Sequence, residues 1–94
     1  LRVMAVGNQG DVLVELGKPA EAAAQFMQAA DLVKSDYTTP MFLMKAGIVY
    51  QQQNDWKNAA RCFGRIVSDF PNSPDATTAK KYAGRAKAMA EQPA

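Results

Sequence analysis

Apolar side chains recur every three or four residues along most of the chain. This spacing places them on one face of an α-helix, and no segment has the strict alternation of a strand. We therefore expect five helices, over residues 1–16, 19–34, 40–53, 56–70 and 74–91. The pattern predicts an all-α protein.

Residues that start or stop helices stand between these segments. Gly17 follows the first segment, at a position where a left-handed residue is favourable. Thr39-Pro40 and Ser73-Pro74 each join a good N-cap to a proline suited to the first helical turn. Asn54-Asp55 turns the chain before the fourth helix, and either side chain is a candidate cap. We therefore expect short connectors between successive helices.

A block of sequence occurs twice, 37 residues apart. Each copy has a glycine, then an alanine, a phenylalanine and a small or branched residue at matching spacings. The first copy has Gly10, Ala22, Phe26 and Ala29, and the second has Gly47, Ala59, Phe63 and Ile66. Self-similarity at this period predicts stacked helical hairpins, because a single hairpin cannot bury its own apolar face.

The residue types in the two copies predict how the helices pack. The glycines and alanines favour close contact between the two helices of a hairpin, since small side chains let backbones approach. Phe26 and Phe63 are expected to fill the space between one hairpin and the next. We expect the stability of the fold to come mainly from these two rings, from Tyr50 and Ile66, and from the glycine and alanine contacts.

The repeated block resembles the tetratricopeptide repeat (TPR), a helix–turn–helix unit with small residues, an aromatic and a closing proline in this order. The second copy carries Leu43, Ala46-Gly47, Tyr50, Ala59, Phe63, Ile66 and Pro71 in the expected places. The first copy departs from the pattern, because Lys34 stands where a closing proline is usual and Gln9 replaces an apolar residue. The resemblance implies one domain over residues 1–94, a right-handed superhelix of two hairpins plus a C-terminal capping helix. The repeats would cover about residues 3–36 and 40–73, and the capping helix about 74–91.

Composition and charge exclude several kinds of function. The 94 residues include eleven basic and nine acidic side chains, a net charge of +2 that does not favour nucleic acid. No apolar run approaches the roughly 18 residues of a membrane span, so we expect no direct membrane contact from this segment. Histidine is absent and cysteine occurs once. We therefore expect no metal site, no cofactor, no catalytic residues and no enzymatic activity.

A TPR-like fold implies a protein or peptide partner on the concave surface formed by the first helix of each hairpin. Candidate binding residues face outward there, with methionine and isoleucine flanked by an acidic end and a basic end. They are Met4, Asp11, Val14 and Glu15 on the first helix, Met41, Met44, Lys45, Ile48 and Gln52 on the third, and Lys81 and Arg85 on the fifth. Methionine adapts to varied apolar surfaces, which suits a partner helix or extended peptide.

An alternative remains open. The apolar surface of the third helix would then pack against another repeat or a second copy, in a structural or self-associating segment of a longer solenoid without its own ligand. Under that alternative the chain forms a homo-oligomer or an internal stacking unit.

The compartment is suggested only by a narrower resemblance. Residues 39–47, the Pro71–Pro74 exit and Lys81-Tyr82 look like the C-terminal part of bacterial membrane-anchored envelope TPR proteins, including accessory subunits of the Sec translocon. The chain starts inside an amphipathic pattern without an initiator methionine, so we expect a fragment of a longer protein.

Overall fold

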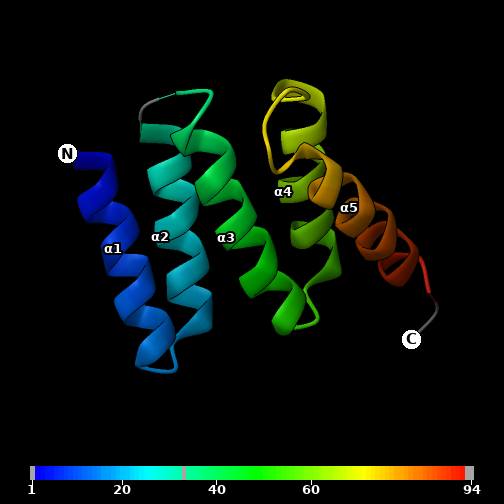
Figure 1. Ribbon diagram of the computed structural model, residues 1–94. Helices are drawn as coiled ribbons and strands as arrows, with labels where there is room; N and C mark the ends of the chain where they lie inside the picture. Colours follow the sequence, from blue (N-terminus) through cyan, green and yellow to red (C-terminus); the bar gives the residue numbers. More distant parts are fainter. Residues whose placement is uncertain (1, 33, 93–94) are drawn as a thin grey trace.

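The computed structural model describes residues 2–32 and 34–92, and no strand occurs in them. This confirms the predicted all-α arrangement of helical hairpins. Figure 1 shows the helices side by side in chain order, and each one packs against its neighbours in sequence. The molecule measures 41 × 32 × 16 Å. The helices are α1 (Arg2–Glu15), α2 (Pro19–Leu32), α3 (Thr38–Gln52), α4 (Trp56–Asp69) and α5 (Ala76–Ala90).

The two hairpins, α1–α2 and α3–α4, share one packing feature. The ring of Phe26 lies against Gly10, where an added Cβ atom would come within 2.5 Å of the ring. The ring of Phe63 lies against Gly47, where the corresponding distance is 2.6 Å. Non-bonded carbon atoms do not approach this closely, so a Cβ atom at either position would clash with the ring. Both positions therefore require glycine, which has no Cβ atom. The glycines thus accommodate a ring from the opposite helix of the same hairpin.

The same two rings also join each hairpin to the next element, as predicted. Phe26 stacks on Phe42 of α3, with 6.5 Å between ring centroids. Phe63 meets Tyr82 of α5 edge to face, with centroids 5.4 Å apart. Aromatic pairs in these geometries stabilise a fold beyond the area that they bury. The rings therefore connect packing within each hairpin to packing between successive elements.

Small side chains form much of the core around these rings. The predicted seam residues Ala22, Ala29 and Ala59 are fully buried, as is Ile66. Tyr50 is half-buried and packs against this core from its edge. The alanines let neighbouring helices approach closely, while Phe26, Phe42 and Phe63 are among the largest fully buried side chains.

Phe42 is a large core residue that the repeat pattern did not identify. Only 2% of it is exposed, and its ring lies where a side chain at Gly7 of α1 would have to be. A second glycine on α1 therefore provides space for a ring, in this case one from the next hairpin. This contact holds α1 directly against α3.

The predicted start of the third helix was wrong. Helix α3 begins at Thr38, two residues before the expected Pro40, and its N-cap Tyr37 makes no side-chain cap. Thr39 is buried, and its Oγ1 accepts a hydrogen bond of 3.0 Å from the backbone N–H of Ser35. The Ser35 hydroxyl instead accepts from the N–H groups of Tyr37 and Thr38. Ser35 therefore binds N–H groups at the start of α3, and Thr39 lies inside the helix rather than at its N-cap.

The start of the fifth helix also differed from the prediction, whereas two other boundaries were confirmed. Helix α5 begins at Ala76, and Ser73-Pro74 lies in the preceding turn, where the Ser73 hydroxyl accepts from the N–H of Asp75. Asp55 caps α4 by accepting from the N–H of Asn58. Gly17 adopts a positive φ of 72° after α1, as its position indicated. Helix α2 is described to Leu32, and residue 33 lies outside the described residues. Lys34, the predicted end of this helix, is not helical.

Candidate interaction surface

A hollow of about 510 Å³ lies between α1 and α3, the first helices of the two hairpins. Its lining combines apolar walls with charged and amide groups. The residues are Asp11, Val14 and Glu15 from α1, Phe26 from α2, and Lys45, Ile48, Val49 and Gln52 from α3. Six of these eight are among the eleven predicted binding residues.

Helical periodicity explains why these side chains meet. Asp11, Val14 and Glu15 are three and four residues apart, so they lie on one side of α1. The 37-residue repeat places Ile48 in α3 where α1 has Asp11, and Gln52 where α1 has Glu15. Because the two hairpins repeat one geometry, equivalent sides of α1 and α3 face the same hollow.

An ion pair crosses the hollow. The Lys45 ammonium lies 2.9 Å from one carboxylate oxygen of Asp11 and donates to both oxygens. The same ammonium lies 5.5 Å from the centroid of the Phe26 ring, a cation–π contact. The predicted binding surface was expected to have an acidic end and a basic end. Asp11 and Lys45 instead pair with each other across the hollow. Glu15, one turn along α1, is exposed beside them.

The apolar part of the hollow is accessible to a partner. Val14 is 44% exposed on α1, and Ile48 is half-buried on α3. Phe26 and Val49, which are almost completely buried, form the floor. Neither was predicted as a binding residue. The repeated glycine–phenylalanine pattern was the sequence signal for Phe26, because it indicates that the Phe26 ring packs against Gly10 of α1, beneath this surface.

The other predicted residues lie outside the hollow. Met41 and Met44 are half-buried on α3 and pack against the core, while Met4 is 43% exposed on α1. Lys81 and Arg85 are exposed on α5. The Arg85 guanidinium lies 5.7 Å from the centroid of the Trp56 ring of α4. The structure therefore does not bring the α5 residues together with the hollow.

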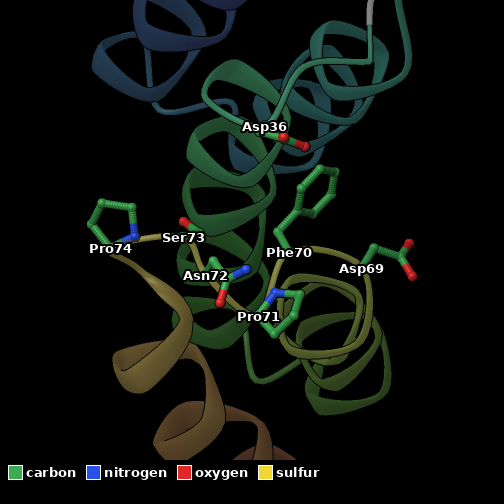
Figure 2. A pocket seen from close by; sticks show the side chains of 7 residues that line it. All are labelled: Asp36, Asp69, Phe70, Pro71, Asn72, Ser73 and Pro74. Atoms are coloured by element: carbon green, nitrogen blue, oxygen red, sulfur yellow. The ribbon is translucent and has the colours of Figure 1, made fainter.

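A smaller opening of about 220 Å³ lies at the end of the molecule where the α2–α3 and α4–α5 connectors meet. Figure 2 shows the Phe70 ring between the carboxylates of Asp36 and Asp69, with Pro71 next to Phe70 and Pro74 on the other side of the opening. Within residues 2–32 and 34–92, no group of three His, Cys, Asp or Glu side chains could hold a metal ion.

The single cysteine is a core residue. Cys62 is buried in α4, with its Sγ 3.5 Å from the Sδ of Met27 in α2. Burial raises the pKa of the Cys62 thiol to about 11, so at neutral pH it carries its proton. A protonated, buried thiol is neither an effective nucleophile nor a ready metal ligand. Cys62 therefore acts as a small apolar residue of the core.

Comparison with known protein families gives a match over most of the second hairpin. Residues 42–73 match the tetratricopeptide repeat. The match covers most of α3, all of α4 and the turn that follows, and it supports a TPR repeat in these 32 of the 94 residues. No significant similarity to a curated protein or to a solved structure was found. TPR repeats generally mediate protein–protein interactions.

The first hairpin extends the repeat beyond the matched residues. Gly10 and Phe26 reproduce the contact that Gly47 and Phe63 make inside the matched TPR.

Among the described helices, none is long and apolar enough to cross a membrane.

Proposed function

We propose that this chain is a protein-interaction scaffold that binds a partner helix or peptide in the hollow between α1 and α3. One observation carries the proposal: both hairpins contribute the same side of their first helix to one accessible, partly apolar surface. Val14 and Ile48 provide apolar contacts, while Glu15 and Gln52 lie exposed at its border.

The chemistry of the hollow favours binding over catalysis. Apolar side chains beside a small number of charged and amide groups suit recognition of an amphipathic segment. The Lys45–Asp11 pair fixes two of the polar groups in place before a partner arrives. No catalytic residue is proposed, and the chain is inferred to act by binding alone.

The narrower setting stays a prediction. A role in a bacterial envelope assembly rests on the resemblance of residues 39–47 and the Pro71–Pro74 exit to membrane-anchored TPR proteins.

Photo-crosslinking from single positions tests the proposed surface. A photoreactive side chain at position 14 or 52 is expected to capture the same partner, because both positions border one hollow. The same group at the exposed position 24 of α2 serves as the control. Equal capture from position 24 would contradict the proposal.

A charge variant gives an independent readout. Ile48→Glu puts a carboxylate in the apolar part of the hollow and is expected to reduce capture at least about tenfold. Gln28→Glu makes a comparable change at an exposed position of α2 and is expected to have no effect. Circular dichroism must show that both variants remain folded. Undiminished capture by folded Ile48→Glu would overturn the proposed site.

A further inference from the structure

The hollow between α1 and α3 has two ends that differ in charge. Figure 1 shows that α1 and α3 run in the same direction, and their last residues, Glu15 and Gln52, both line the hollow. Asp11 and Lys45 lie one to two helical turns before these residues and neutralise each other through their ion pair. We call the part of the hollow at Glu15 and Gln52 its C-terminal end.

The C-terminal end of the hollow carries negative charge that no described side chain balances. Aligned peptide dipoles place a partial negative charge at the C-terminus of each helix, and neither α1 nor α3 has a basic residue in its last turn. Within residues 2–32 and 34–92, the Glu15 carboxylate takes part in no ion pair. Lys18, the basic residue nearest to it in sequence, lies 4.0 Å from Glu21 of α2. This end of the hollow therefore favours a cation from another molecule.

The stability of α1 does not explain the presence of Glu15. The side chain is exposed, and a carboxylate at the C-terminus of a helix is unfavourable because it adds to the negative end of the dipole. The equivalent position of α3 holds the neutral Gln52. The first hairpin thus has an acid at a position that its own helix disfavours and that lines the proposed binding surface.

From these charges we propose that the partner presents a basic side chain to the C-terminal end of the hollow, about one helical turn from an apolar side chain that packs on Val14 and Ile48. This inference rests on the proposed function and names the chemistry of its partner. Arginine fits best, because its guanidinium can donate to both Glu15 oxygens and to the amide oxygen of Gln52. Ile48 and Gln52 are four residues apart, about 6 Å along α3, which sets the spacing between the two partner side chains.

Selection from a library of random peptides of about 12 residues, or three helical turns, tests the proposal on the whole 94-residue chain. Only peptides whose binding is lost on Ile48→Glu are kept, because this confines the selection to the hollow. We expect them to carry Arg or Lys three or four residues from an apolar residue. Glu15→Lys should weaken their binding at least about tenfold, since it replaces a charge-assisted contact by repulsion. Glu21→Lys makes the same charge change at an exposed position of α2 and is the matched control, with unchanged affinity expected.

A charge-reversed peptide separates a direct contact from the effect of overall charge. Replacing the basic residue of a selected peptide by glutamate should abolish binding to the wild-type chain and restore binding to Glu15→Lys. Circular dichroism checks folding, which Glu15→Lys should preserve because a lysine suits the C-terminus of a helix.

The outcomes distinguish this inference from the proposed function. Peptides that depend on Ile48 but lack the basic residue, or that bind folded Glu15→Lys as tightly as the wild-type chain, would overturn the basic partner and leave the proposed function standing. A selection that yields no peptide dependent on Ile48 would overturn both.

Discussion

The two hairpins contain the same glycine–phenylalanine contact but differ in how their first helices are covered. Helix α3 is packed on both sides and buries Phe42, Leu43 and Val49. Helix α1 has one neighbour in sequence and exposes Val12 where α3 buries Val49. The comparison shows that the contact inside a hairpin can stay constant while the exposure of its first helix differs.

The two hairpins also differ in sequence at the positions where the TPR match begins and ends. The match begins at Phe42 and ends at residue 73, so it includes the large core residue at the start of α3 and the closing Pro71. The first hairpin has Ala5 and Lys34 near the corresponding positions. It nevertheless keeps the contact between Gly10 and the Phe26 ring.

The largest expected effect comes from removing a ring from the repeated contact. Phe63→Ala and Phe26→Ala should each reduce the free energy of unfolding by about 3–5 kcal/mol, because each empties a core site. Urea unfolding followed by circular dichroism measures both. Phe26→Ala with a loss below about 1 kcal/mol would show that the first hairpin is not packed like the second.

Filling the glycine positions tests the same contact in the opposite direction. Gly47→Ala and Gly10→Ala should each destabilise the fold by about 1–3 kcal/mol, because the new methyl group meets the phenylalanine ring. Gly64→Ala is the matched control in the interior of α4, where nothing lies within 4 Å of an added Cβ. It should stabilise the chain by about 0.5–1 kcal/mol. Stabilisation by Gly10→Ala would contradict the packing of the first hairpin.

Alkaline pH should distinguish the hairpins, because Cys62 in α4 stands where α2 has the half-buried Gln25. Burial raises the pKa of the Cys62 thiol from 9.0 to about 11. Below pH 9 the folded and unfolded states both hold the proton, so this group leaves stability unchanged. Between pH 9 and about 11 the unfolded state loses its proton first, and the free energy of unfolding falls.

Cys62→Ala should remove this part of the pH dependence. Any remaining alkaline loss is expected from Tyr50, whose pKa is also raised by burial. A thiol reagent should react slowly with the folded wild-type chain at pH 8, and fast labelling there would contradict the burial of Cys62.

The smallest effect is expected from the ion pairs that join the two hairpins. Lys45 pairs with Asp11 at 2.9 Å, and Arg65 of α4 pairs with Asp31 of α2 at 3.2 Å. Both pairs are partly exposed, so a double-mutant cycle should give a coupling of about 0–1 kcal/mol for each. A coupling above about 2 kcal/mol for Lys45 and Asp11 would show that this pair, rather than ring packing, holds α1 against α3.

Local pattern predicted the helices, the hairpins and the seam around Phe26 and Phe63, because these features repeat along the chain. It did not predict the burial of Phe42 against Gly7, because this contact does not repeat along the chain. In the other copy of the block, Ala5 stands at the position of Phe42 and Met44 at the position of Gly7. The early start of α3 was missed because Ser35 and Thr39 exchange hydrogen bonds with the backbone in a way that residue type alone does not determine.

The candidate site was predicted in part for the same reason. Side chains on one side of α1 and α3 follow from helical periodicity, and six of them line the hollow. The pairing of Lys45 with Asp11 depends on how two helices are placed, so charge alone did not reveal it. The register of α5 relative to α3 was likewise not determined by spacing, and Arg85 instead contacts Trp56.

The central claim is that the first hairpin, outside the family match, repeats the packing of the second and so creates the hollow. Nuclear Overhauser contacts between glycine Hα protons and phenylalanine ring protons test it most directly. We predict contacts for both pairs, Gly10 with Phe26 and Gly47 with Phe63. A Gly47–Phe63 contact without a Gly10–Phe26 contact would contradict the claim.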